Sequence, residues 1–184
     1  LGPLFGARVV GLGNSELRME MARRMGAHET YMSSDPDLQA KLDQFTGGDG
    51  IDLVIETANP WPAYRTGMEI VRDNGRVAIV ALLGRGESPL DFNPFNMEWF
   101  YNKGVSIIAV KGIAGNLYPS EQEHLQWNRH CAHVLSLMAD GKLEPKRLIT
   151  HRLHYTEMKK AYELAYHREK TMLGVTFDWR DAGE

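Results

Sequence analysis

Short apolar runs alternate along the chain with amphipathic stretches, and this alternation predicts strands separated by helices. The runs predicted to be strands are residues 7–12, 29–32, 51–56, 76–82, 105–111 and 172–177. Between most of them, apolar residues recur three or four positions apart, which is typical of helices with one buried face. A strand–helix–strand order of this kind predicts an α/β fold, in which a mostly parallel sheet is covered by helices.

The amphipathic stretches predict five helices. The first covers residues 15–25, and the fourth covers residues 120–140 and begins with a capping box at Ser120. Asp35 followed by Pro36 predicts the start of the second helix, and Thr156 is the predicted cap of the last one. The positions predicted to be buried are Leu17, Met21 and Met25; Leu38, Leu42 and Phe45; Tyr64, Met68 and Val71; Trp127, Cys131, Val134, Leu135 and Met138; and Met158, Ala161, Tyr162 and Ala165.

Two stretches interrupt the regular pattern. Asn74 and Gly75 predict a sharp turn between the third helix and the strand that follows it, because glycine tolerates backbone conformations that other residues avoid. Residues 84–104 are rich in proline and aromatic side chains, and they predict a loop with a short helix.

Composition narrows the class of protein. The chain has 184 residues, of which 43% are apolar and 24% are charged, and these proportions are typical of one globular domain. A net charge of −3 provides no broad positive surface, so nucleic acid is not an expected partner. Cys131 is the only cysteine, which excludes an intrachain disulfide and favours a reducing, cytoplasmic setting. No apolar run approaches the ~20 residues that span a bilayer, so no membrane segment is expected.

Five segments in a fixed order resemble one protein family. They are residues 7–27, 45–56, 70–77, 137–143 and 148–152. Their order and spacing resemble the nucleotide-binding domain of medium-chain dehydrogenases of the zinc-type, alcohol-dehydrogenase-like kind. The resemblance implies a Rossmann-type, doubly wound sheet. It also implies that residues 1–150 form a truncated dinucleotide-binding domain and that residues 151–184 return toward a catalytic domain.

The same resemblance implies parts that this sequence does not match. The family has an N-terminal catalytic domain with the zinc ligands, followed by a first strand and a G-x-G-x-x-G turn over the cofactor pyrophosphate. The run from Gly11 to Glu16 is superficially similar to that turn, but Glu16 replaces the third glycine and its carboxylate would face the pyrophosphate. We therefore expect zinc only if the catalytic domain supplies its ligands, and we expect this chain alone to be inactive.

The unmatched first strand lies in the middle of the family's sheet. Two explanations stay open: the chain is part of a longer protein, or residues 7–12 pair in another way, including with a second copy. We expect the isolated chain to be poorly stable or obligately associated, and a stable monomer in sedimentation with a sharp unfolding transition would contradict this hypothesis.

The end of the first predicted strand bears on the choice of cofactor. Dehydrogenases that prefer NAD usually have an acidic residue there, which accepts hydrogen bonds from the ribose 2′-hydroxyl. This chain has Gly13, followed by the neutral donors Asn14 and Ser15 and by Arg18 one helical turn later. By resemblance, this arrangement favours NADP, with NAD as the alternative. A simpler interpretation is that Gly13 only forms a turn and that Arg18 is a solvated charge.

Three later strands end in segments at the carboxyl edge, where open parallel sheets bind their ligands. The resemblance places the first two of these segments, residues 56–59 and 81–84, near the cofactor. The residues predicted to contact the cofactor there are Thr57, Ala58, Asn59, Ala81, Leu82 and Gly84. A third such segment is residues 111–114. The alternative is that all of these are ordinary turns between strands and helices.

Other residues admit both a functional and a structural interpretation. His130 and His133 are spaced for chelation on one helix face, but no third ligand follows, so surface histidines are the favoured interpretation. His151 and His154 are predicted to be surface or interdomain residues. The aromatic run from Trp99 to Tyr101 fits a substrate wall or a packed core. The strand between Val105 and Val110 resembles the edge through which such enzymes form homodimers.

The predicted function is hydride transfer between NADP or NAD and a small alcohol, aldehyde, ketone or quinone. One alternative is a non-catalytic remnant that binds a nucleotide or serves as an interaction module. A second alternative is a methyltransferase-like domain, because residues 51–56 followed by residues 74–80 also suit that class. No acidic residue ends the first strand and no glycine-rich loop precedes it, which disfavours the methyltransferase.

Overall fold

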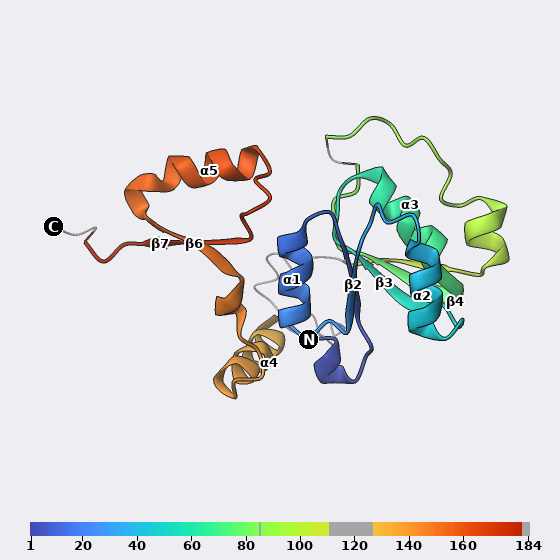
Figure 1. The fold of residues 1–184 in the computed structure, drawn as a ribbon, viewed down its shortest axis with the longest axis horizontal. Helices are drawn as coiled ribbons and strands as arrows, with labels where there is room; N and C mark the ends of the chain where they lie inside the picture. The colour runs from blue at the N-terminus through green and yellow to red at the C-terminus, as the bar shows by residue number, and fades with distance from the viewer. Residues whose placement is uncertain (85, 111–126, 182–184) are drawn as a thin grey trace. The chain divides into compact units, whose positions relative to one another are not determined.

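The structure, a computed structural model, describes residues 1–84, 86–110 and 127–181. These residues belong to two compact units: one is formed from Leu1–Met32 and Tyr118–Glu184, and the other is Ser33–Leu117. Every strand pair in the described residues is parallel, and helices connect the paired strands (Figure 1). The predicted α/β class with parallel sheets is therefore confirmed.

The N-terminal part of the first unit is a small strand–helix–strand motif. Its elements are a 3-10 helix η1 (Pro3–Phe5), β1 (Val10–Gly13), α1 (Glu16–Arg24) and β2 (Glu29–Met32). Strand β1 pairs with β2, and α1 packs on them through the buried side chains of Met19 and Met21. The predicted strand at residues 7–12 is thus shorter at its start, whereas β2 occupies its predicted residues.

The C-terminal part of the first unit contains a second strand–helix–strand motif. Its elements are α4 (Trp127–Ala139), η3 (Pro145–Leu148), β6 (Ile149–His154), η4 (Tyr155–Glu157), α5 (Met158–Tyr166) and β7 (Gly174–Asp178). Strands β6 and β7 pair in parallel, with α5 as their connection. The sequence analysis did not identify β6, because polar His151, Arg152 and His154 interrupt its apolar alternation.

Some predicted caps and buried faces of the later helices are wrong. Thr156 does not cap α5; its hydroxyl lies 2.7 Å from Nδ1 of His154, and α5 begins after Glu157. Tyr162 is 69% exposed and Leu135 is 62% exposed, whereas Ala161 on α5 and Leu137 on α4 are buried. Helical periodicity identifies the apolar face of a helix, but the neighbouring elements determine which residues of that face are buried. The capping box predicted at Ser120 lies outside the described residues.

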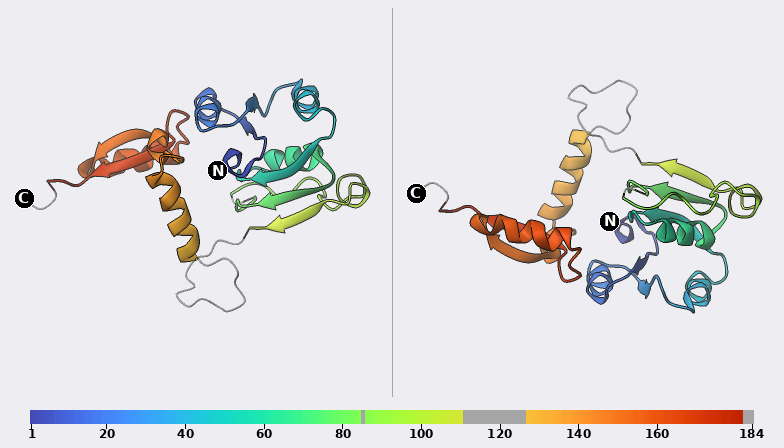
Figure 2. Two further views of the ribbon diagram at one scale, coloured as in Figure 1. Left: turned by 90° about the horizontal axis from the view of Figure 1, so that it is seen from below. Right: turned by 90° about the horizontal axis from the view of Figure 1, so that it is seen from above.

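The second unit is built around one three-stranded sheet with a helix packed on one of its faces. Its elements are α2 (Leu38–Thr46), β3 (Ile51–Glu56), α3 (Trp61–Ile70), β4 (Val71–Ile79), η2 (Met97–Asn102, a π-helix) and β5 (Ser106–Ala109). The strand order is β3-β4-β5, and α3 lies along one face of the sheet (Figure 2). The loop with a short helix predicted at residues 84–104 is present in its described part. Helix α2 begins after Asp37 and not at Pro36, because Asp35 Oδ1 accepts the Asp37 N–H at 2.9 Å.

Strand β4 differs from its prediction at both ends. It begins at Val71, so Asn74 and Gly75 lie within it, at an irregularity where Asn74 adopts a left-handed φ of 56°. The register against β3 shifts there, from Ile51 opposite Val71 to Leu53 opposite Arg76. At the other end β4 stops at Ile79, which leaves residues 80–82 in the turn beyond the sheet edge.

The core of the second unit lies on one face of its sheet. It consists of Tyr64, Met68, Val71, Val77, Trp99 and Val105. The opposite face carries a row formed by Ile55, Ala78 and Ile108, which the strand register places side by side. Ile55 is 61% exposed and Ile108 is 42% exposed, although parallel sheets are usually covered on both faces. The second unit therefore presents an apolar sheet face to solvent.

Two further observations concern the chain's organisation. Among the described residues, strands β1 and β3 belong to separate sheets. Among the residues that the structure describes, no helix is both long enough and apolar enough to cross a membrane.

Candidate functional site

The first group of predicted cofactor residues surrounds the start of α1. Gly13 ends β1, Asn14 is exposed, and Ser15 occupies the N-cap position with an extended backbone. Ser15 is buried, and its hydroxyl lies 3.5 Å from the carbonyl oxygen of Lys170. Arg18 is exposed on the first turn of the helix. A Cβ atom on Gly13 would lie 3.6 Å from Cγ of Met19, an ordinary contact distance, so the backbone of Gly13 has room for a Cβ atom.

This turn has the chemistry of an anion or hydroxyl site with one opposing charge. The free N–H groups and the positive dipole at the start of α1 favour a negative group. The guanidinium of Arg18 adds to this preference, whereas the exposed carboxylate of Glu16 in the same turn opposes it. The turn thus offers donors for a ribose hydroxyl or its phosphate, with the balance between them set by Arg18 and Glu16.

The second group lies in the other unit, at the carboxyl end of β3. Thr57, Ala58 and Asn59 follow the strand and are exposed. Glu56, the last residue of β3, is 7% exposed, and its Oε1 accepts the Ala58 N–H at 2.6 Å. Burial raises the pKa of Glu56, and hydrogen bonds from the amides of Ala58 and Thr57 partly offset that increase. The turn is therefore closed by a buried carboxylate.

The turn that follows β4 is tied to the turn that follows β3. The amides of Val80 and Ala81 donate to the main-chain oxygen of Glu56, at 2.9 Å and 3.2 Å. The amide of Gly84 donates to the carbonyl oxygen of Asn59 at 2.9 Å. Leu82 lies between these contacts and is exposed. Residues 57–59 and 81–84 consequently form one continuous edge of the second unit.

Gly84 and Trp61 fix the shape of this edge. Gly84 has a φ of 70°, and a Cβ atom there would lie only 2.6 Å from Cη2 of Trp61. The indole ring therefore packs directly on the backbone of Gly84. Trp61 begins α3, and its Nε1 donates to the carbonyl oxygen of Ser88 at 2.7 Å, which secures the following loop.

The structure thus brings six of the predicted residues to one edge and the other four to a turn of the first unit. The third predicted segment, residues 111–114, lies outside the described residues. Sequence reasoning placed Glu56 in the first segment near the cofactor without predicting a contact for it, and it did not identify Trp61. The available signal for Glu56 was a carboxylate that ends an otherwise apolar strand, which is costly unless the group has a partner.

The remaining candidates take structural positions. His130 and His133 are exposed on α4, and among the described residues no three His, Cys, Asp or Glu side chains form a group that could hold a metal ion. His154 lies between Thr156 and Asp181, with its Nε2 2.7 Å from Oδ1 of Asp181. Trp99 belongs to the core of the second unit, which agrees with packing and not with a substrate wall.

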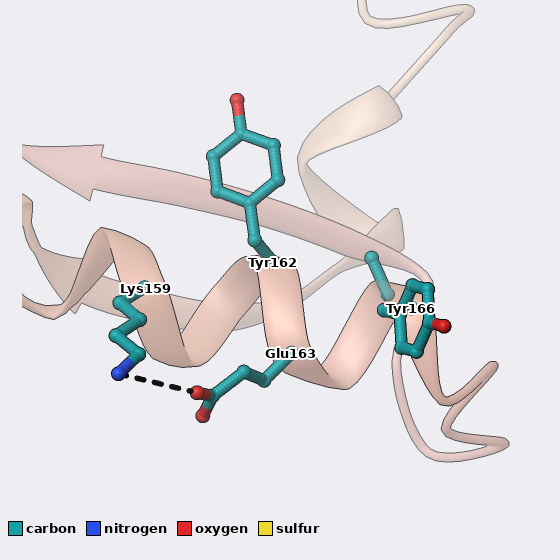
Figure 3. A pocket seen from close by; sticks show the side chains of 5 residues that line it. Lys159, Tyr162, Glu163 and Tyr166 are labelled. Atoms are coloured by element: carbon teal, nitrogen blue, oxygen red, sulfur yellow. Dashed lines mark ion pairs between the residues drawn. The ribbon is translucent and has the colours of Figure 1, made fainter.

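A shallow hollow lies on α5, away from the predicted cofactor residues in sequence. Its lining residues are Lys159, Tyr162, Glu163, Ala165 and Tyr166. Figure 3 shows Lys159 and Glu163 facing each other, with Nζ and Oε1 3.9 Å apart. The hydroxyls of the two tyrosines point outward from the helix (Figure 3). None of these residues was predicted to bind a ligand.

Comparison with known proteins identifies the family. The family model described as zinc-binding dehydrogenase matches residues 3–127, which is more than half of the chain. The chain belongs to the zinc-binding dehydrogenase family. A sorbitol dehydrogenase from Halalkalibacterium halodurans is 27% identical over 154 residues, which cover 84% of this chain and 40% of that protein.

Solved structures show the same fold. A dehydrogenase of unknown specificity from Escherichia coli aligns with a TM-score of 0.72 and 22% identity, over 96% of this chain and 46% of that one. An Escherichia coli alcohol dehydrogenase in complex with NADH aligns with a TM-score of 0.69 and 16% identity, over 94% of this chain and 45% of that one. The chain therefore has the Rossmann-like fold of these proteins and spans less than half of their length.

The family name implies zinc, and the described residues do not provide a site for it. No described group of three or more ligating side chains is present, and the single cysteine, Cys131, is on α4. We therefore assign no zinc ligand within the described residues and derive no step of a reaction through the metal.

Proposed function

We propose that this chain is the nucleotide-binding part of an oxidoreductase that transfers a hydride between NADP or NAD and a small alcohol or carbonyl compound. One observation carries the proposal: the turns after β3 and β4 are joined into a single exposed edge at the carboxyl end of a parallel sheet. Open α/β sheets bind their ligands at this edge. Membership of the zinc-binding dehydrogenase family supports a dinucleotide as that ligand.

The proposed chemistry divides between the cofactor and the protein. The nicotinamide carries the hydride, and the protein binds and orients it. The residues proposed to contact the cofactor are Gly13, Asn14, Ser15, Arg18, Thr57, Ala58, Asn59, Ala81, Leu82 and Gly84. The described residues contain no assigned acid, base or metal ligand for the substrate, so we propose that the chain alone does not catalyse.

The proposed substrate is a small alcohol or the matching aldehyde or ketone, with a quinone as a further possibility. The sorbitol dehydrogenase that the chain resembles supports an alcohol, because its name gives a polyol as substrate. The cofactor is proposed to be NADP, since Gly13 leaves no carboxylate at the end of β1 and Arg18 is one turn away. NAD is the alternative, because the related Escherichia coli structure contains NADH.

The wider organisation is also part of the proposal. Residues 1–150 would form the nucleotide-binding domain and residues 151–184 would lead toward a catalytic domain. Strand β5 pairs on one side with β4, and its other edge supports a homodimer through the segment from Val105 to Val110. The single cysteine supports a reducing, cytoplasmic setting.

Nucleotide binding to the full 184-residue chain tests the proposal directly. NADPH and NADH are titrated separately while nicotinamide fluorescence is followed, with S-adenosylhomocysteine as a comparison ligand. Saturable binding of NADPH, weaker binding of NADH and no binding of S-adenosylhomocysteine are expected. Binding of S-adenosylhomocysteine alone would support the methyltransferase alternative, and binding of no nucleotide would contradict the proposal.

A further inference from the structure

Glu56 is a carboxylate in an apolar position. It ends β3, and only 7% of its surface is exposed. Helix α3 makes room for it at Gly67, where a Cβ atom would lie 3.8 Å from Oε2 of Glu56 and 3.2 Å from Cγ1 of Val54. Burying a charged group is costly unless hydrogen bonds compensate for the lost water. The sequence thus places a costly side chain where an apolar residue would pack against the same helix.

The hydrogen bonds of Glu56 lead to both turns of the proposed cofactor edge. Its side chain accepts the Ala58 N–H at 2.6 Å, which closes the first turn two residues after the strand. Its main-chain oxygen accepts the N–H groups of Val80 and Ala81, which begin the second turn. A bond between an amide and an ionised carboxylate is stronger than one between neutral groups. Glu56 therefore bonds to both turns of the cofactor edge, to the first through its side chain and to the second through its main-chain oxygen.

We propose that Glu56 is a positioning residue for the dinucleotide, and this inference rests on the proposed function. Its carboxylate holds the Ala58 amide inward, and this orientation presents Thr57 and Asn59 at the exposed edge. The carbonyl oxygen of Asn59 in turn accepts the Gly84 N–H. A first turn that is fixed by Glu56 therefore also holds the second turn in place. Glu56 acts through these backbone groups and is not proposed to touch the reacting atoms.

The experiment combines a structural signal with an affinity, both measured on the full chain. The Ala58 amide proton is followed by NMR, because a short hydrogen bond to a carboxylate shifts its resonance downfield. NADPH affinity is measured by titration on the same samples. The variants are Glu56→Gln, which keeps an acceptor oxygen at the same reach, and Glu56→Asp, which is one methylene shorter. Asp49→Asn is the control, because Asp49 is exposed before the opposite end of β3.

Glu56→Asp is expected to move the Ala58 resonance upfield and to weaken NADPH binding by about tenfold, the effect of losing about 1.4 kcal/mol. Glu56→Gln is expected to retain most of the affinity, and Asp49→Asn is expected to change neither signal. Thermal unfolding followed by circular dichroism identifies any variant that fails to fold, in which case Glu56→Gln decides: a Glu56→Gln variant that has lost the downfield Ala58 resonance but binds NADPH as tightly as wild type would overturn the proposal.

The outcomes separate this inference from the proposed function. If wild-type chain binds NADPH and folded Glu56→Asp binds it equally well, the positioning role is wrong and the proposed function stands. If wild-type chain binds neither NADPH nor NADH, the proposed function fails and the inference fails with it. A shifted Ala58 resonance accompanied by a loss of affinity supports both.

Discussion

The Nζ atom of Lys103 lies 2.9 Å from the carbonyl oxygen of Val71. The same ammonium group is 2.7 Å from the carbonyl oxygen of Glu69 and 3.1 Å from that of Met68. These carbonyls lie at and just beyond the C-terminal end of α3, where main-chain oxygens have no partner within the helix. Burial lowers the pKa of Lys103, and nearby carboxylates such as Asp73 partly offset that change. Lys103 therefore joins the end of η2 to the end of the helix that begins at the cofactor edge.

Replacing Lys103 by methionine is expected to destabilise the second unit by about 1–3 kcal/mol, because buried carbonyl oxygens lose a charged donor. Hydrogen exchange of the last amides of α3 should accelerate, and urea unfolding should give the free-energy change. Lys142→Met is the control, since the ion pair of Lys142 with Asp140 is at the surface. Equal effects of the two substitutions would show that the three carbonyl contacts do not stabilise the helix end.

Gly84→Ala is expected to disturb the cofactor edge by two separable effects. The left-handed φ of 70° costs any other residue about 1 kcal/mol or more, and the added methyl group collides with Trp61. Gly86→Ala is a matched control, because Gly86 has a φ of 78° but no atom within 4 Å of the added Cβ. The indole N–H resonance of Trp61 should shift in the Gly84 variant only. A larger loss of stability in the Gly86 variant would contradict the steric account.

Gly13→Asp is expected to reverse the preference between NADP and NAD. A carboxylate at the end of β1 would accept hydrogen bonds from a ribose 2′-hydroxyl and repel a 2′-phosphate, as in NAD-preferring dehydrogenases. NADPH should bind about tenfold more weakly, a change of about 1.4 kcal/mol. Gly13→Ala provides the control for added volume, which the 3.6 Å distance to Met19 tolerates. If the ratio of the NADPH and NADH dissociation constants is the same in Gly13→Asp as in wild type, the adenosine ribose does not bind next to Gly13.

The raised pKa of Glu56 predicts a pH dependence of stability with a definite sign. Burial favours the neutral carboxyl group in the folded chain, so folding takes up a proton as the pH rises above about 4, the ordinary range of a glutamate. The stabilising contribution is complete below that range and is lost as the pH rises through the raised pKa. Compared with Glu56→Gln, wild type should therefore lose stability as the pH rises above about 4, the ordinary range of a glutamate, and through the raised pKa. Urea unfolding of both proteins at several pH values measures this difference, which should vanish if Glu56 titrates normally.

The sequence predicted the parts of the fold that depend on strong local signals. Ile51–Glu56 and Glu29–Met32 were located at their residues, because each is a short apolar run between polar breaks. The strand Ile149–His154 was missed, because its pairing with β7 comes from distant residues that local periodicity does not report. Tyr162 was predicted to be buried but is exposed, for a similar reason: the apolar face of α5 is wider than the part of it that neighbouring elements cover.

The candidate site was predictable to a similar extent. Segments that follow strands were identified because the carboxyl ends of parallel strands share an edge, and the structure joins Asn59 to Gly84 as that rule requires. The positioning role proposed for Glu56 could not be predicted, because it depends on burial, which one sequence does not show. The contact between Trp61 and Gly84 also required coordinates, because the two residues are 23 positions apart in the sequence.

The exposed row of Ile55, Ala78 and Ile108 also affects how this chain behaves in concentrated solution. Three aliphatic side chains lie side by side on this sheet face, and Leu53 on the same face is 41% exposed. Contact between two such surfaces releases water, whereas a net charge of −3 provides little electrostatic repulsion to oppose it. The osmotic second virial coefficient of the chain should therefore be negative, and added salt should make it more so.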